Sequence, residues 1–414
     1  MSAGGGGNGA AGGVSGSGGG GDAAGGGTTG IGGGAGTTTT AGSGGDVGSG
    51  GVAGSAGTGA GGSAGAASAG RGGASAGSGG STGGRGGAGG RGGGGGTGGS
   101  SGSGGSAGST GTGGSGGSTS TSKPTIYFLD VGGKVLTAAD AENPTVKTLV
   151  PSAGQGPDGI AVDLAAGYVY WTDMGVPADN DGTVMRSNLD GSNVVTIVPK
   201  AGTYTPKQLR IDTAGRKLYW SDREGMRVMR ANLDGSSIET LVTTGTTDAD
   251  RADNSRWCVG MALDLAGGWF YWSQKGPANG GVGTLRRAHI VMPAGQDSTN
   301  RTDIEVLFAG LPEPIDLELD LEAGLIYWAD RADNTISRAP IEIPAGSTAA
   351  TRKDRQIIVK NVGVAIGVAI DKPRGRMYYT GGNGQLGRAN LDGTADMEIS
   401  GVGTLTGIVV VHLP

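Results

Sequence analysis

Apolar and polar residues alternate in short segments throughout residues 124–414. The segment PDGIAVDLAAGYVYWTD at 157–173 contains two such stretches, joined by a short connection that includes Gly167. Side chains of a β-strand point to opposite faces in turn, so a period of two residues indicates a strand with one buried face. Two such strands joined by a short glycine-containing connection are typical of a β-hairpin. We therefore predict a hairpin here.

Close relatives of this segment recur along the chain, giving five copies in all. Their matching tyrosines lie 49 to 56 residues apart, at Tyr170, Tyr219, Tyr271, Tyr327 and Tyr378. Three copies are followed by a second hairpin signal, such as VMRSNLDGSNVVTIV after the first copy. The Asp-Gly pairs at 190–191, 234–235 and 392–393 suit a tight hairpin turn, because both residue types tolerate positive φ. Each repeat is therefore predicted to form four strands.

Four-stranded sheets that recur about every 45–50 residues predict the blades of an all-β fold, the β-propeller. The strand pattern is incomplete at both ends of the domain. LTGIVVV at 405–411 matches a first strand with no second strand after it, and IYFLD at 126–130 matches a second strand with no first strand before it. We therefore predict that the two ends build a sixth blade together, which closes the ring and removes a free sheet edge.

The last four residues of each copy carry a resemblance to a known family. They read YWTD (170–173), YWSD (219–222), YWSQ (271–274), YWAD (327–330) and YYTG (378–381), with YFLD (127–130) in the terminal blade. The domain thus resembles the YWTD repeat family, the class B repeats of low-density lipoprotein receptors, whose members form six-bladed β-propellers. The resemblance covers residues 124–414, and its repetition in every blade makes it specific.

The resemblance implies that the motif residues are architectural. The indole rings would fill space between blades, and the final aspartate would tie a loop by hydrogen bonds. The residues concerned are Tyr170, Trp171, Asp173, Tyr219, Trp220, Asp222, Tyr271, Trp272, Tyr327, Trp328 and Asp330. Gln274 and Gly381 replace the aspartate, so blades three and five should be tied less well. The family also implies a rigid disc that binds a protein or small ligand on one face, which is an analogy at the level of the fold.

Residues 1–123 have a different composition, with 60 of the 96 glycines and no aromatic residue. Burial of so few apolar side chains cannot offset the entropy lost on ordering the backbone. We therefore predict a long disordered tail before the propeller of residues 124–414. Such tethers suit secreted or surface-anchored bacterial proteins, but the first thirty residues lack a secretory signal. A signal upstream would place the protein outside the cell or on its surface; without one it is cytoplasmic.

Composition also bears on the class of partner. The chain has 31 Lys and Arg against 36 Asp and Glu, a formal net charge of −5 at pH 7, and this balance suits nucleic-acid phosphates poorly. Cys258 is the single cysteine, which excludes an internal disulfide and a thiolate zinc cluster. No apolar run reaches about 18 residues, so no membrane-spanning helix is expected. We expect a monomer without a cofactor.

Four polar residues interrupt a pattern of small residues on the predicted inner strands. Blades one, three and five carry glycine and, two residues later, alanine at this place, and the terminal blade carries Gly407 and Val409. Blade two carries Gln208 and Arg210 instead, and blade four carries Asp316 and Glu318. We interpret the four as channel residues. An Arg210–Glu318 ion pair in a watery channel is the structural explanation, and a ligand site is the alternative.

The longest predicted connections should emerge on one face of the propeller. They span residues 173–182, 243–257, 274–283 and 330–334. Long loops on a rigid scaffold commonly carry function, and an exposed tryptophan beside Arg and Asp resembles a protein-contact hot spot. The predicted binding residues are Trp257, Arg256, Arg251, Asp250, Asp253, Asp179 and Asp181. These oxygen-rich loops could hold Ca²⁺, but none has the spacing of an EF-hand, and solvated acidic loops are the simpler interpretation.

No catalytic constellation is evident, since no Ser/His/Asp order occurs in a strand-turn-helix context and neither histidine, His289 or His412, lies near Cys258 in the sequence. We therefore predict a non-enzymatic binding module that presents a protein- or ligand-binding face on a flexible tether. The alternative is a gluconolactonase-like propeller hydrolase with a channel metal held by Asp316 and Glu318. Such a site needs several carboxylate or amide ligands, and Arg210 would repel a cation, so the binding module is favoured.

Overall fold

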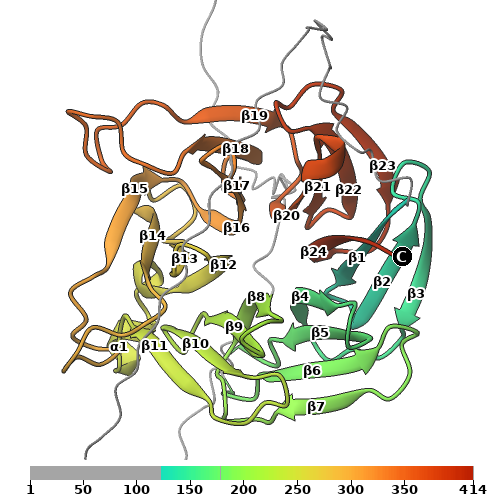
Figure 1. The fold of residues 1–414 in the computed structure, drawn as a ribbon, viewed down its shortest axis with the longest axis horizontal. Helices are drawn as coiled ribbons and strands as arrows, with labels where there is room; N and C mark the ends of the chain where they lie inside the picture. The colour runs from blue at the N-terminus through green and yellow to red at the C-terminus, as the bar shows by residue number, and fades with distance from the viewer. Residues whose placement is uncertain (1–122, 178, 414) are drawn as a thin grey trace, which may run out of the picture. The chain divides into compact units, whose positions relative to one another are not determined.

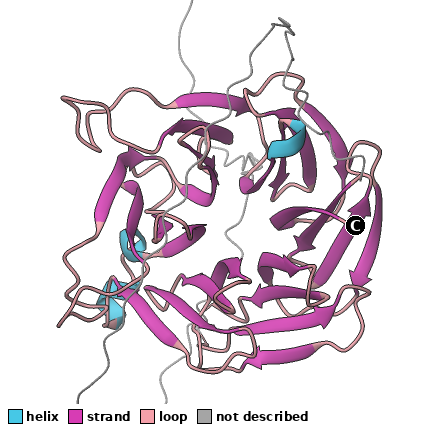
Figure 2. Ribbon diagram, viewed as in Figure 1, coloured by secondary structure: helices cyan, strands magenta, loops and turns pink. Residues whose placement is uncertain are grey.

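The computed structural model describes residues 123–177 and 179–413, which form a ring of six four-stranded antiparallel sheets (Figures 1 and 2). The six-bladed β-propeller expected from the repeats is therefore confirmed. The tail predicted for residues 1–123 lies outside the described residues except for Lys123, so its disorder stays a prediction.

Five blades are continuous in sequence, and each begins with its inner strand. Blade one comprises β4 (Pro157–Asp163), β5 (Tyr168–Asp173), β6 (Thr183–Asn188) and β7 (Val195–Val198). Blade two comprises β8 (Pro206–Asp212), β9 (Lys217–Asp222), β10 (Arg227–Asn232) and β11 (Glu239–Thr243). Blade three comprises β12 (Cys258–Asp264), β13 (Trp269–Gln274), β14 (Gly283–His289) and β15 (Glu305–Leu311).

The remaining continuous blades follow the same order. Blade four comprises β16 (Pro314–Asp320), β17 (Leu325–Asp330), β18 (Thr335–Pro340) and β19 (Gln356–Lys360). Blade five comprises β20 (Ala365–Asp371), β21 (Arg376–Gly381), β22 (Gln385–Asn390) and β23 (Met397–Gly401). Short helices occur as α1 (Asp248–Arg251), η1 (Asn254–Arg256) and η2 (Lys372–Arg374). None of the described helices is long and apolar enough to cross a membrane.

The sixth blade, called the terminal blade, contains both ends of the domain. Its inner strand β24 (Leu405–His412) pairs antiparallel with β1 (Pro124–Asp130), which is followed by β2 (Lys134–Ala139) and β3 (Thr145–Val150). Tyr127 lies opposite Val409 in this pairing. The predicted closure of the ring by the two ends of the domain is confirmed.

The motif tryptophans pack between neighbouring blades. Trp171 lies in a buried cluster with Leu129 of the terminal blade, and Trp272 lies in one with Tyr219 of blade two. The fully buried motif tryptophans are Trp171, Trp220, Trp272 and Trp328. Each large ring thus removes apolar surface of two blades from water, which is the role that the family resemblance implied.

A side-chain hydroxyl links the inner strand of five blades to that of the next blade, a role that the sequence analysis missed, and in blades one, two, three and five it stands at the third place of the motif. Thr172 Oγ1 accepts from Gly159 N at 2.7 Å within blade one and donates to Lys207 O at 2.8 Å in blade two. Equivalent donations run from Ser221 to Gly260, from Ser273 to Ile315, from Thr380 to Thr406 and, out of the terminal blade, from Thr406 to Pro157. Blade four has Ala329 at this place, so its junction with blade five cannot have the link.

The inner-strand glycines have a steric cause. A Cβ on Gly159 would lie 2.4 Å from the carbonyl oxygen of Lys207, and a Cβ on Gly260 would lie 2.1 Å from that of Ile315. The close approach of neighbouring inner strands therefore requires glycine at these positions.

The final aspartate of the motif ties the chain segment that precedes its own blade. Asp173 Oδ1 accepts from Gly156 N at 2.7 Å, and Asp222 Oδ1 accepts from Thr205 N at 2.7 Å. In blade three, Gln274 Nε2 instead donates to Ser255 O at 2.7 Å. The replacement therefore reverses the direction of the hydrogen bond rather than removing the tie.

Candidate functional site

Arg210 reaches across the centre of the ring from the inner strand of blade two to that of blade four. Its Nη2 lies 3.1 Å from Asp316 Oδ1 and donates to Leu317 O at 2.7 Å, whereas Glu318 Oε2 lies 3.9 Å away. The guanidinium is thus ion-paired as predicted, but its close partner is Asp316 and not Glu318. Gln208 does not join this group, because its Nε2 donates to Asp158 Oδ1 at 3.2 Å in blade one.

Asp316 is fully buried between blades four and five. Its Oδ2 accepts from Val368 N at 3.2 Å, on the inner strand of blade five, across the junction that has no hydroxyl link. Burial raises the pKa of Asp316 to about 7, although Arg210 acts in the opposite direction. Burial also raises the pKa of Glu318. The channel therefore holds carboxyl groups that bind protons more strongly than an exposed carboxyl group does.

The raised pKa of Asp316 has a consequence for stability, because the folded protein then binds a proton more strongly than the unfolded chain. The stability gained from protonation of Asp316 is fully present below pH 3.8, the ordinary pKa of an aspartate. It is lost as the pH rises through about 7, the pKa in the folded protein. We expect the unfolding free energy of an Asp316→Asn variant to vary less between pH 4 and pH 8, by on the order of 4 kcal/mol. Denaturant unfolding across this range measures the difference. Parallel pH profiles of the two proteins would show that Asp316 does not titrate there.

The channel residues do not fit a metal ion. The Arg210 guanidinium lies within ion-pair distance of both Asp316 and Glu318, the two acids that would have held a cation. Within residues 123–177 and 179–413, no group of three or more His, Cys, Asp or Glu could hold a metal ion. The geometry therefore gives no support to the hydrolase alternative. Binding of Ca²⁺ by the acidic loops stays a prediction.

The connection between blades two and three, residues 243–257, is more ordered than the plain loop that was expected, since it contains α1 and η1. Thr247 caps α1 with a reciprocal pair of hydrogen bonds: its hydroxyl accepts from Asp250 N at 3.1 Å, and Asp250 Oδ2 accepts from Thr247 N at 3.1 Å. The sequence TDAD carries this capping signal. It was overlooked because Asp stands where Glu or Gln is usual.

The predicted charged residues of this connection mostly engage one another. Arg256 Nε lies 3.2 Å from Asp250 Oδ1 and 3.5 Å from Asp253 Oδ2. The Arg251 guanidinium lies 4.2 Å above the ring of Tyr204. These contacts hold the shape of the loop, so Arg256 contributes to it mainly as a positioning residue.

Trp257 is half-buried, which corrects the expectation of an exposed tryptophan. Its Nε1 donates to Arg251 O at 2.9 Å, which fixes the orientation of the ring. The Arg223 guanidinium lies 4.9 Å and the Lys275 ammonium 5.2 Å from the ring centroid. The ring lies outside the described interblade clusters, so it is not a core residue either.

The connection at 173–182 supplies the other two predicted residues. Asp179 is exposed, whereas Asp181 lies 3.1 Å from Lys200 and is held by it. Thr205 Oγ1 donates to Pro177 O at 3.4 Å, which attaches this connection to the segment before blade two. Tyr204, the residue before Thr205, lies beneath the Arg251 guanidinium. The connections at 173–182 and 243–257 therefore meet through this segment.

Three cations, two of them beside the Trp257 ring, were missed by the sequence analysis. Arg223, Lys275 and Arg331 directly follow YWSD, YWSQ and YWAD, in blades two, three and four. We call these three residues the cation arc. The pKa of Lys275 is lowered mainly by burial and further by the charges of Arg331 and Arg223, so each arginine lies close enough to repel Lys275. Their shared position after the motif is the signal that could have identified them.

Two buried acids partly neutralise the cation arc. Glu313 is fully buried and lies 2.6 Å from Lys275 and 3.0 Å from Arg331, and Glu224 lies 2.6 Å from Arg223. Three positive charges thus face two negative ones. Within this group the positive charges exceed the negative ones by one.

Comparison with known proteins places these observations in a family. No family model matches the chain. The chain is 40% identical over 279 residues to a protein of Pyricularia oryzae named low-density lipoprotein receptor-related protein 1, which covers 64% of this chain and 88% of that protein. It is 32% identical over 298 residues to the 3-hydroxyacyl-CoA dehydrogenase-like protein LAM1 of Cochliobolus heterostrophus, which covers 67% of this chain and 62% of that protein.

A solved structure agrees with this likeness. A chain of the nidogen/laminin complex superposes with a TM-score of 0.54 at 19% identity, over 70% of this chain and 99% of that chain. At this identity the superposition speaks for the fold alone. The first relative is matched over most of its length, and the motif recurs around a ring of six blades. The chain therefore belongs to the YWTD repeat family of six-bladed β-propellers, the class B repeats of low-density lipoprotein receptors.

Proposed function

We propose that the propeller is a binding module whose partner protein docks on the loop-bearing face, at Trp257 and the cation arc. The observation that carries this proposal is the half-buried Trp257 ring, with Arg223 and Lys275 beside it. Tryptophan and arginine dominate the residues that supply binding energy at protein interfaces, and partly enclosed rings of this kind are typical of such sites.

The ring is held in place before any partner arrives. The hydrogen bond from Trp257 Nε1 to Arg251 O and the capped helix α1 fix the loop that carries it. A site that is already ordered loses little conformational freedom on binding, so more of the contact energy contributes to affinity. Lys275 is buried, so the positive charge that a partner meets comes mainly from Arg223 and Arg331, and it would favour a partner with an acidic surface and speed the encounter.

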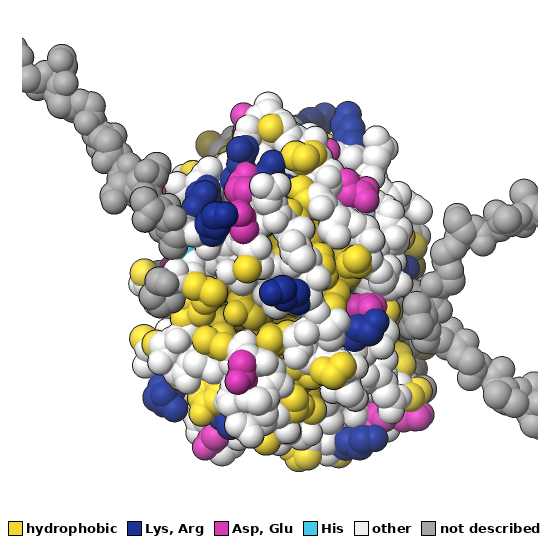
Figure 3. All heavy atoms as spheres, turned by 90° about the vertical axis from the view of Figure 1, so that its right-hand side faces the viewer, with side chains coloured by type: hydrophobic (Ala, Val, Ile, Leu, Met, Phe, Trp, Pro, Cys, Tyr) yellow, Lys and Arg dark blue, Asp and Glu magenta, His cyan; other side chains and the backbone are white. Residues whose placement is uncertain are grey.

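Another side of the ring offers less to such a partner. Figure 3 views the propeller from the right-hand side of Figure 1, where the terminal blade lies. Lys, Arg, Asp and Glu are interspersed among apolar and neutral groups there, without a broad patch of one sign among the described residues of that view. The cation arc is therefore the better candidate for electrostatic attraction.

A Trp257→Ala variant tests the proposal. We expect partner affinity to fall by on the order of 1–3 kcal/mol, because the ring's contact area is lost while the fold is kept. A photo-crosslinking amino acid placed at an adjacent exposed loop position captures the partner, and calorimetry with that purified partner gives the affinity. Leu321→Ala is the matched control, since Leu321 is exposed in the turn between β16 and β17, on the opposite face. A large drop in melting temperature with unchanged affinity would instead make Trp257 a structural residue.

A further inference from the structure

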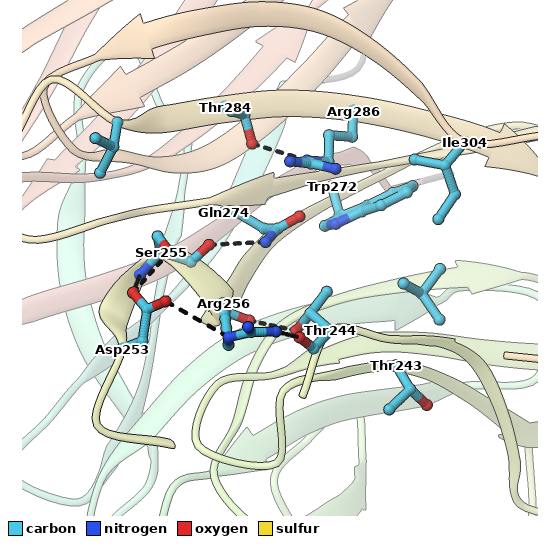
Figure 4. A pocket seen from close by; sticks show the side chains of 12 residues that line it. Thr243, Thr244, Asp253, Ser255, Arg256, Trp272, Gln274, Thr284, Arg286 and Ile304 are labelled. Atoms are coloured by element: carbon cyan, nitrogen blue, oxygen red, sulfur yellow. Dashed lines mark hydrogen bonds and ion pairs between the residues drawn. The ribbon is translucent and has the colours of Figure 1, made fainter. Parts of the chain in front are cut away.

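A pocket of about 500 Å³ lies between blades two and three (Figure 4). Trp272, Gln274 and Arg286 of β13 and β14 form one wall. Thr244, after the end of β11, and Asp253, before η1, lie on the other. The volume is within the range of about 300–1,000 Å³ that is usual for small-molecule sites.

Arg286 is a cation without a carboxylate partner. Its Nε donates to Thr284 Oγ1 at 3.0 Å, and its terminal amino groups donate to no residue that the structure describes. No ion pair joins it to an Asp or Glu of residues 123–177 or 179–413. The titratable group that acts on it is the Cys258 thiol, whose pKa burial raises to about 12, so that thiol is neutral at pH 7. No negative charge of the described residues therefore neutralises Arg286.

No other blade places a charge at this position. Arg286 lies opposite Trp272 across the β13–β14 pairing. The residues at the same place in the other blades are Met185, Met229, Ser337, Gly387 and Leu136. An uncharged side chain thus suffices to pack against the motif ring, so packing does not account for an arginine here.

Two further polar atoms of the pocket lack partners. Trp272 Nε1 and Gln274 Oε1 are buried and make no hydrogen bond in the described structure. The equivalent indoles of blades one and two are satisfied, since Trp171 donates to Ala153 O at 2.7 Å and Trp220 donates to Thr203 Oγ1 at 3.0 Å. A buried polar group without a partner is costly, so a donor and an acceptor left open beside an unpaired cation point to a ligand.

Blade four provides a useful contrast. Trp328 Nε1 also lacks a partner, but the arginine beside that ring, Arg355, lies 2.6 Å from Asp333 and is ion-paired. Only in blade three, among the described blades, do the open indole and an arginine without a carboxylate share a pocket.

We propose that this pocket binds a small organic carboxylate that also carries a hydroxyl or amino group. The carboxylate accepts from the planar guanidinium of Arg286 and from Trp272 Nε1, and the ligand's hydroxyl or amino group donates to Gln274 Oε1. Val242 and Val282 supply apolar contacts for its carbon atoms. Asp253, the one acid of the lining, does not oppose the ligand strongly, because its oxygens already accept from Ser255 and lie near Arg256.

The experiment titrates the full chain with lactate, which carries a carboxylate and a hydroxyl, and with the neutral analogue lactamide. Spectra of ¹⁵N-labelled protein report the indole N–H groups of its six tryptophans. We expect lactate to shift one indole signal saturably, with a Kd of roughly 1 mM, and lactamide to shift none. In Arg286→Met, which copies the residue of blades one and two, we expect binding at least about tenfold weaker.

Two variants separate the site from other effects. Arg287→Met removes an equal charge from the next residue, which is paired with Glu305 and lies outside the pocket lining, and should bind lactate like the wild type. Arg286→Lys keeps the charge but loses the planar fork, and should bind with intermediate affinity. The proposal does not depend on the protein-docking face, since Trp257 is not among the residues that line the pocket. Equal shifts with lactamide, equal affinity in Arg286→Met, or no shift up to about 50 mM lactate would each overturn the proposal.

Discussion

Removal of residues 405–414 should abolish the cooperative unfolding transition of the propeller. Residues 405–412 of this segment form β24, whose Leu405 and Ile408 are buried in a cluster with Phe128 and Tyr378 of the neighbouring strands. Without β24, strand β1 has an unpaired edge, and blade five is exposed to water where β24 was. Circular dichroism and calorimetry on the truncated chain measure the loss. A truncated protein that keeps the wild-type melting transition would show that β24 is not needed for closure.

A single substitution gives a milder form of the same test. A Cβ added to Gly407 would lie 2.2 Å from Asp158 O, across the junction with blade one. Gly407→Val should therefore lower the melting temperature without removing any strand pairing. This variant distinguishes a specific need for close packing at the junction from a general effect of shortening the chain.

Glu313→Ala is expected to destabilise the fold by about 3–5 kcal/mol, because it leaves two cations without their buried partner. Glu313 is fully buried and lies 2.6 Å from Lys275, whose own side chain is 5% exposed. Removal of one partner of a buried ion pair leaves an uncompensated charge, which costs more than the pair contributed. Urea unfolding at neutral pH measures the change.

Glu342→Ala is the matched control for this prediction. Glu342 lies 2.7 Å from Arg287, but its side chain is 77% exposed, so the loss of this pair should cost at most about 1 kcal/mol. The double variant Glu313→Ala, Lys275→Met should recover part of the lost stability, since the buried ammonium is then absent. If Glu313→Ala and Glu342→Ala lower the free energy of unfolding by the same amount, burial does not increase the contribution of the Glu313 ion pairs.

Strand pairing and ring closure were predictable because their signals are local. Alternation over a few residues and an Asp-Gly turn identify a hairpin wherever they occur, and the incomplete strand sets at 126–130 and 405–411 identify the shared blade. The hydroxyl links were not predictable in this way. Thr172 follows the tryptophan in one blade, but its acceptor, Lys207 O, belongs to the next repeat and is a backbone group that no pattern marks.

The candidate site was less predictable for a related reason. Arg223, Lys275 and Arg331 are each about one repeat apart in the chain and come together only through the curvature of the ring. The burial of Trp257 was misjudged because its covering groups lie in the blades on either side of it rather than in its own loop. Similarly, Arg210 is within reach of both Asp316 and Glu318, and only the backbone geometry decides that Asp316 is closer.

The junction between blades four and five differs from the other five in chemistry as well as in geometry. At the other five junctions a hydroxyl group forms the side-chain hydrogen bond between inner strands, and a hydroxyl stays uncharged over the physiological pH range. At this junction the carboxyl group of Asp316 takes that place, because it accepts a hydrogen bond from Val368 N, and its pKa is raised to about 7. Local opening of a protein begins where its bonds are weakest under the prevailing conditions. The ring therefore has one junction whose stability depends on pH, and local opening motions should be concentrated at the interface between blades four and five.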